Sequence, residues 1–364
     1  MTNAVNIAQS GSNSVTFRNR IINGAMVIDQ RNAGASITVN NTNLNYSVDR
    51  WWGSGKTSDG VYTMQRSTST PPTGFSNFLR VTVTTADASI AAGDTYYMGT
   101  KIEGFNVADL GFGSANAQTI TISFWARSSV TGTFSGALLN GAENRSYPFT
   151  FAINTANTWE YETITIAGDT TGTWATDNTA GMVLTFDLGN GSNWRATAGS
   201  WVAAGEYGAT GAVTLISTLN ATFDITGVQL EEGTAASPFE FRQYGTELAL
   251  CQRYYEKSYE QSVVPGSAST SGYSSMNNPD QGSNVYVFNT DRFAATKRAA
   301  ATMRFWDLAG NLNRITNYTL GGLARSDNNN SVFSYTGSQS GAVMINVQAA
   351  STAGTYQWDA SAEL

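Results

Sequence analysis

The sequence predicts an all-β protein, in which an antiparallel β-sandwich of the jelly-roll type is followed by a short helix and a smaller C-terminal β-domain. Short segments rich in β-branched and aromatic residues recur along the chain, and turns rich in Gly, Asn and Ser separate them. Charged residues make up only 13% of the 364 residues, whereas 36 residues are Gly. A polar but uncharged, turn-rich composition is typical of antiparallel sheets joined by many loops.

The N-terminal segment, MTNAVNIAQSGSNSVT, is small and polar and has no core pattern. We expect residues 1–16 to form a docking arm that orders only against a partner; a frayed chain end is the alternative. Because the segment has neither a basic region nor an apolar run, we do not expect it to be a secretory signal peptide.

Strand-like alternation runs through residues 17–243, which we predict to form the jelly-roll sandwich. The stretch TITISFWA is one example: Ile120, Ile122 and Phe124 fall on one face of the strand. Trp125 falls on the opposite face, among Thr and Ser residues. Strict alternation of this kind indicates half-buried strands of antiparallel sheets.

Residues 244–272 interrupt this alternating pattern and predict a helical neck followed by a polar linker. Thr246 suits the N-cap position, and the pattern after it predicts a helix over about 246–259. Residues at spacings of three and four form one face, which we predict to be the contact between subunits: Leu248, Cys251, Tyr255 and Tyr259. Packing of the same face onto the sandwich of its own chain is the alternative.

Residues 273–364 return to the strand pattern and predict the C-terminal β-domain. The stretches AVMINVQA and TYQWDASAEL both alternate between apolar and polar residues. The chain is long enough for two domains, each with its own core, and we assign these cores to the sandwich and to this domain.

Histidine is absent from the sequence and there is a single cysteine. The chain therefore lacks the commonest general base and metal ligand, any Ser-His or Cys-His nucleophile, an internal disulfide and a zinc cluster. The net charge of −7 disfavours nucleic acid, because phosphate binding needs clustered Lys and Arg. No stretch approaches the roughly 18 apolar residues of a membrane span, so we expect no membrane insertion.

Paired carboxylates could still make a glycosidase, since that chemistry needs no histidine. Glu160 and Glu162 lie two residues apart on one strand, and Glu231 and Glu232 lie at a strand end. We therefore expect no enzyme activity. Calcium is the one possible cofactor, because it binds oxygen ligands only, and the candidate ligands are Asp224, Glu231 and Glu232.

Large aromatic residues occur in stretches such as TGTWATDNTAG and NGSNWRATAGSW, which we predict to be long surface loops. A large aromatic side chain in such a loop needs either cover from the fold or a ligand. The candidate glycan-stacking residues are Trp174, Trp194 and Trp201. Packing of these side chains against a neighbouring loop or subunit is the alternative.

Several stretches resemble a family of bacteriophage virion proteins described as tail fibre or receptor-binding-like proteins. The most specific are NGAMVIDQR, DRWW and GVQLEEG with the PFE that follows it. The region from 17 to 243 also resembles carbohydrate-binding modules of the jelly-roll type. The second resemblance implies glycan binding by exposed aromatic residues and, in many such modules, a structural calcium ion.

These resemblances imply a non-enzymatic structural protein of a phage particle, a tail fibre that contacts glycan on the host surface. A head decoration, capsid fibre or baseplate connector with no ligand of its own is the alternative. We expect synthesis in the host cytoplasm, a place on the virion surface, and attachment to other virion proteins through the N-terminal arm. A homotrimer is favoured, and a dimer or a monomer on the virion remains open.

Overall fold

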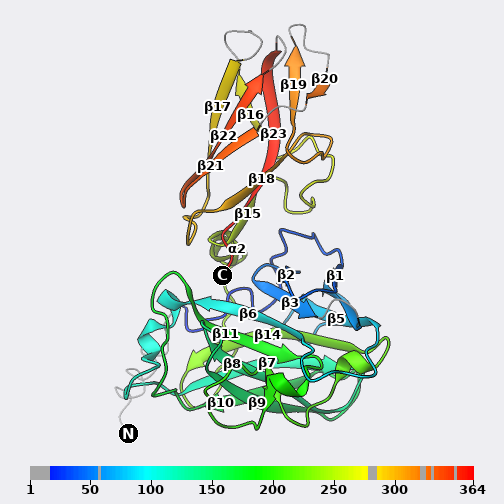
Figure 1. Ribbon diagram of the computed structural model, residues 1–364, viewed down its shortest axis with the longest axis vertical. Helices are drawn as coiled ribbons and strands as arrows, with labels where there is room; N and C mark the ends of the chain where they lie inside the picture. Colours follow the sequence, from blue (N-terminus) through cyan, green and yellow to red (C-terminus); the bar gives the residue numbers. More distant parts are fainter. Residues whose placement is uncertain (1–16, 56–58, 278–284, 320–324, 329–331, 348–350) are drawn as a thin grey trace.

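The computed structural model describes residues 17–55, 59–277, 285–319, 325–328, 332–347 and 351–364. The predicted arm, residues 1–16, lies outside the described residues. A two-sheet sandwich and a smaller β-domain are joined through one short α-helix, as Figure 1 shows. The expected all-β fold is therefore confirmed, and its sheets pair strands that are almost all antiparallel. Among the described residues, no helix has the length and apolar character needed to cross a bilayer.

Two six-stranded sheets form the sandwich. Sheet A has the order β1 (Ile37–Val39), β4 (Val61–Ser67), β5 (Phe78–Thr85), β14 (Thr222–Glu232), β7 (Ile120–Ser128) and β10 (Glu160–Ile166). Sheet B has the order β2 (Asn45–Tyr46), β3 (Trp51–Gly55), β6 (Tyr96–Glu103), β11 (Ala180–Asp187), β8 (Gly132–Asn140) and β9 (Ser146–Ile153). Shorter elements lie in the loops: η1 (Gly104–Asn106), η2 (Ala108–Leu110), η3 (Ser192–Trp194), η4 (Leu215–Ser217) and the parallel pair β12 (Arg195–Ala196) and β13 (Gly208–Ala209).

The core lies between the two sheets and is rich in aromatic side chains. Ile120, Ile122 and Phe124 point into it from β7 and are fully buried. The Phe124 ring packs edge-on against Phe186 of the opposite sheet, with ring centroids 5.1 Å apart. The alternation that the sequence predicted for this strand is correct, and Trp125 is left outside the main core.

The C-terminal domain is organised around one long strand, β23 (Ser351–Ser361). This strand pairs with β15 (Tyr255–Lys257), β16 (Ser274–Asn277), β18 (Thr302–Trp306) and β19 (Ile315–Thr319), and β19 pairs with β20 (Arg325–Asn328). A separate three-stranded sheet has the order β17 (Val285–Arg292), β22 (Ser340–Val347) and β21 (Val332–Thr336).

The neck differs from the predicted helix over 246–259. Helix α2 spans Tyr244–Gln252, and Tyr255 already belongs to β15, where it pairs with Ser361 of β23. The prediction of one continuous helix is wrong because pairing with a strand about 100 residues later overrides the local spacing of three and four.

The predicted subunit contact is already buried within the single chain. Cys251, Tyr255 and Tyr259 are each at most 2% exposed, and Leu248 is half-buried. Burial raises the pKa of the Cys251 thiol well above its ordinary value, as expected for an unreactive core cysteine. These side chains leave no free stripe for a three-fold axis, so the structure corrects this prediction in favour of packing within one chain.

The two β-domains meet through buried ion pairs beside the C-terminus, which lies next to α2 in Figure 1. The carboxylate of Glu363 pairs with Arg50 and, at 3.0 Å, with Arg31. The Arg50 guanidinium stacks 3.6 Å from the ring centroid of Tyr254, and Arg31 stacks 3.7 Å from that of Tyr255. The end of the C-terminal domain is thus fastened to the sandwich by charge and by stacking.

Replacing this carboxylate tests how firmly the domains are joined. Glu363→Gln leaves the buried Arg50 with a neutral partner and leaves Arg31 with only Asp49, at 3.7 Å, and removing one member of a buried pair costs about 3–5 kcal/mol. We expect a clear fall in the melting temperature in differential scanning calorimetry. The exposed Glu260 provides the control substitution Glu260→Gln. Equal melting temperatures for the two variants would contradict this account of the junction.

Candidate functional site

Two of the predicted glycan-stacking residues pack against the sandwich instead of standing free. The rings of Trp174 and Trp201 meet edge to face, with centroids 5.4 Å apart, and both contact Phe112. Their indole N–H groups donate hydrogen bonds to the carbonyl oxygens of Thr171 (3.1 Å) and Ala167 (2.8 Å). This cluster covers the main core, which favours the packing alternative for these two residues.

Trp194 belongs to a different ring cluster, on the outer face of sheet B. It packs on Tyr207, whose ring stacks nearly parallel to Tyr97 with centroids 4.3 Å apart. Tyr97 in turn meets Trp52 edge-on. The Trp194 N–H donates to the carbonyl oxygen of Gly93 at 3.1 Å. The three predicted tryptophans therefore do not form one platform.

The three predicted calcium ligands do not converge either. Asp224 pairs with Arg80 (2.8 Å) and Arg127 (2.7 Å), and Glu231 pairs with Arg18 (3.0 Å). Asp224 and Glu231 are seven residues apart on β14, which is roughly 20 Å along a strand.

The third predicted ligand, Glu232, is exposed at the end of β14. Two of the three carboxylates thus have arginine partners, and the distance along the strand prevents them from sharing one ion. The structure therefore corrects the predicted ligand set.

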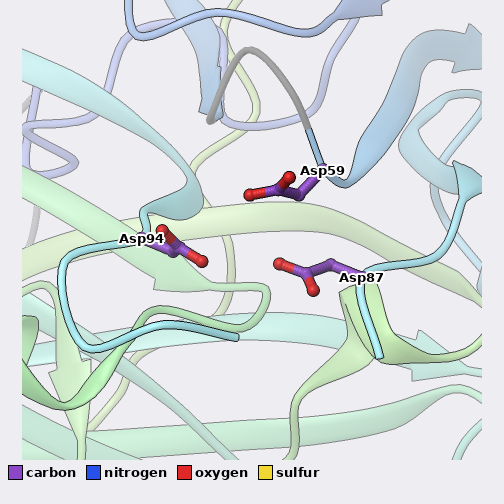
Figure 2. Close-up of side chains that lie close together, drawn as sticks. All are labelled: Asp59, Asp87 and Asp94. Atoms are coloured by element: carbon purple, nitrogen blue, oxygen red, sulfur yellow. The ribbon is translucent and has the colours of Figure 1, made fainter. Parts of the chain in front are cut away.

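Another group of carboxylates does converge, as Figure 2 shows. Asp59, Asp87 and Asp94 each offer an oxygen, and these oxygens lie within 4.8 Å of one another. Tyr96 Oη donates to Asp87 Oδ2 at 3.0 Å, and the N–H of Ser89 donates to Oδ1 of the same residue at 2.9 Å. An all-oxygen donor set of this kind fits calcium.

Sequence reasoning missed this acidic group because its members come from separate loops. Asp59 precedes β4, Asp87 follows β5 and Asp94 precedes β6, and their spacing matches no defined calcium loop. The three residues come together only because the two sheets of the sandwich pack against each other.

An open aromatic site lies on the outer face of sheet A, in a groove of about 430 Å³. We call it the aromatic groove, and its aromatic side chains are Phe75, Trp125, Tyr161, Phe239 and Phe241. Trp125 of β7 and Tyr161 of β10 are direct cross-strand partners, so their side chains leave the sheet on the same face. Their ring centroids are 5.3 Å apart.

A β-bulge in β14 makes the floor of the aromatic groove. The pairing register between β14 and β7 shifts between Thr226 and Gln229. Gly227 lies in this bulge with φ of 64°, in the left-handed region. A Cβ atom at this position would lie only 2.6 Å from Cζ of Phe75. Glycine therefore lets Phe75 approach the sheet closely.

Polar side chains of β14 hold in place the segment 237–241, which forms one side of the aromatic groove. The Glu240 N–H donates to Gln229 Oε1 at 2.9 Å, and the Ser237 N–H donates to Glu231 Oε1 at 2.8 Å. Gln229 Nε2 also donates to Glu231 Oε1, at 2.9 Å. These bonds fix the position of the segment, which carries Phe239 and Phe241 of the aromatic groove.

Glu240 also fastens the start of the described chain to this segment. Its carboxylate accepts hydrogen bonds from the backbone N–H groups of Phe17 (2.7 Å), Arg18 (3.3 Å) and Asn19 (2.8 Å). Burial acts to raise the pKa of Glu240, but these N–H groups and the charge of Arg242 together lower it below its ordinary value.

Sequence reasoning placed Trp125 on the polar face of its strand but did not select it as a site residue. A large aromatic side chain among outward-facing Thr and Ser was the available signal. Trp125 also differs from Trp174, Trp194 and Trp201 in its hydrogen bonding. Its indole N–H has no acceptor among the described residues, whereas theirs are bonded to backbone carbonyls.

Comparisons with known proteins add little about function. No protein-family model and no curated protein matches the sequence. The enzymatically active domain of bacteriophage CBA120 tailspike protein 4 is 11% identical (TM-score 0.31), with 59% of this chain and only 22% of that chain covered. A putative sugar binding protein from Bacteroides thetaiotaomicron is 12% identical (TM-score 0.34), with 59% and 100% covered.

The family 11 carbohydrate-binding module from Clostridium thermocellum, in complex with a mixed-linked tetrasaccharide, is a further similar structure. It is 10% identical to this chain (TM-score 0.28), and the match covers 56% of this chain and 97% of the module. At such low identities and TM-scores, these likenesses carry no argument about what the chain binds.

The acidic group predicts a response to calcium. We expect added Ca²⁺ to raise the melting temperature and EDTA to reverse the effect, because an ion held only by the folded state stabilises it by about 2.7 kcal/mol at 100 times its Kd. Asp87→Asn should abolish the response, and the exposed Asp109→Asn should keep it. A wild-type melting temperature that calcium does not change would exclude this site.

Proposed function

We propose that this chain is a non-enzymatic carbohydrate-binding protein of a phage virion, a tail fibre that contacts host-surface glycan through the aromatic groove. The glycan part rests on the groove, and the virion part rests on the sequence resemblance described above. In this proposal the protein is made in the host cytoplasm, attaches to the virion surface through residues 1–16 and assembles there as a homotrimer, through a surface other than the buried neck residues.

The paired rings of Trp125 and Tyr161 carry the glycan proposal. Binding sites for small ligands are lined mostly by apolar and aromatic side chains with a few polar groups that set orientation. Sugar rings have apolar C–H faces that pack on aromatic rings, and hydroxyl groups that need polar partners. Thr73 lines the groove and offers an exposed hydroxyl group for this purpose.

The positions of the carboxylates support the proposal that the protein is not an enzyme. Within the ranges that the structure describes, no Asp or Glu lines the aromatic groove. Burial and the neighbouring Glu160 raise the pKa of Glu162 to about 7. The carboxylate of Glu160 is engaged elsewhere, because it accepts hydrogen bonds from the backbone N–H groups of Asn154 (2.9 Å) and Thr155 (2.8 Å). A hydrolase would need two carboxylates facing one sugar bond.

A scaffold role remains the second candidate, as a head decoration, capsid fibre or baseplate connector. Phe17 and Phe105 are 50% and 61% exposed and line a cavity with Leu250 next to α2. Exposed apolar clusters of this kind mark contacts between proteins. In this alternative, the exposed apolar surface packs against another virion protein and binds no glycan.

Substitutions in the groove, tested on an array of bacterial surface oligosaccharides, examine the proposal. Trp125→Ala and Tyr161→Ala should each weaken binding at least about tenfold, equivalent to 1.4 kcal/mol. Tyr273→Ala is the matched control, because Tyr273 lies in the C-terminal domain and is 49% exposed, compared with 45% for Tyr161. Glycan binding that survives both groove substitutions, or no binding by the wild type, would refute the proposal.

A further inference from the structure

A second cavity adjoins the aromatic groove and shares a wall with it. This cavity, of about 350 Å³, is lined by Asn19, Ile21, Glu240 and Glu247 among others. Four residues line both spaces: Gly74, Phe75, Phe239 and Phe241. The two cavities therefore open on either side of one wall.

Three phenylalanine rings in mutual contact build this wall. The ring centroids of Phe75 and Phe239 are 5.2 Å apart, those of Phe75 and Phe241 are 5.1 Å apart, and those of Phe239 and Phe241 are 4.9 Å apart. Phe241 is 60% exposed, so a ligand can cross the wall over its ring. A ligand longer than one sugar ring can thus touch both cavities.

The charges around the two cavities argue against an anionic ligand. In the described part of the chain, the residues that line the aromatic groove include no charged side chain. Among its described lining residues, the second cavity has one cation, Arg242, which pairs with Glu240 and Glu247 at 3.4 Å each. A sugar carboxylate or phosphate would therefore meet two acids and a guanidinium that already has partners.

Two arginines whose neighbours line the groove, Arg18 and Arg127, have partners as well. Arg18 donates to the carbonyl oxygen of Pro238 at 2.8 Å and pairs with Glu231. Arg127, two residues after Trp125, pairs with Asp224. In contrast, Thr73 and Ser76 line the two spaces with exposed, uncharged hydroxyl groups.

We infer that the two cavities together bind a stretch of at least two neutral pyranose residues, hexose or N-acetylhexosamine, and discriminate against uronic acids, sialic acids and phosphorylated sugars. This inference rests on the proposed glycan-binding function. One residue of the glycan packs on Trp125 and Tyr161, and the next crosses Phe241 into the second cavity.

The charge preference is tested with the full-length chain on an array that pairs neutral oligosaccharides with uronic-acid, sialic-acid and phosphorylated counterparts of equal length. We expect neutral ligands to bind at least about tenfold more tightly than their anionic counterparts, and Trp125→Ala to remove that binding. Preferential binding of anionic glycans that also depends on Trp125 would overturn this inference and leave the proposed function intact. Binding of no glycan, or binding independent of Trp125, would overturn both.

The two-cavity arrangement is tested by ligand length in isothermal titration calorimetry. For the best neutral ligand on the array, the tetrasaccharide should bind the wild type at least about fivefold more tightly than the disaccharide. Phe241→Ala should remove this gain and leave disaccharide affinity within about twofold. Phe105→Ala is the matched control, since Phe105 is 61% exposed and lines neither cavity. Equal affinity for both lengths in the wild type would refute the arrangement.

Discussion

The hydrogen bonds from β14 to the segment that follows it determine how the functional face of this protein is built. Gln229 and Glu231 leave the strand on its outer face and bind the backbone of Ser237 and Glu240. Buried polar groups of this kind cost free energy unless each finds a partner, so the network specifies one arrangement of the segment. That arrangement carries the phenylalanine wall and therefore the shape of both cavities.

The same network extends to the neck. Arg242 connects Glu240 to Glu247 of α2, and Glu247 accepts a hydrogen bond from the backbone N–H of Asn23. At the other side of the neck, the Glu363 carboxylate holds two arginines of the sandwich. The segment between the two domains is thus fastened at both ends, which explains why its aromatic residues are buried within one chain.

Local patterns in the sequence were sufficient where neighbouring residues determine the outcome. Alternation placed Phe124 inside and Trp125 outside, because side chains of a strand must point to opposite faces. Contacts between distant residues could not be predicted in the same way. Tyr255 follows the helical spacing of α2 but pairs with Ser361, and Asp59 meets Asp94 only through the two sheets.

The aromatic loops illustrate the same limit. Trp174 and Trp201 were candidates for free loop residues, but Phe112, which lies 62 residues before Trp174 and 89 before Trp201, packs against both. Composition of a loop does not reveal what covers it. Conversely, the sequence around Gly227 did not predict that this residue would form the floor of a groove, because that role depends on the close approach of Phe75.

The indole N–H signals of the nine tryptophans, followed by ¹⁵N-TROSY NMR, test the central claim most directly. Each signal can be assigned by a single Trp→Phe substitution and followed while a glycan that binds the wild type is added. The account predicts that the Trp125 signal moves and that those of Trp174, Trp194 and Trp201 remain in place. Movement of the Trp194 or Trp201 signal with an unchanged Trp125 signal would contradict it.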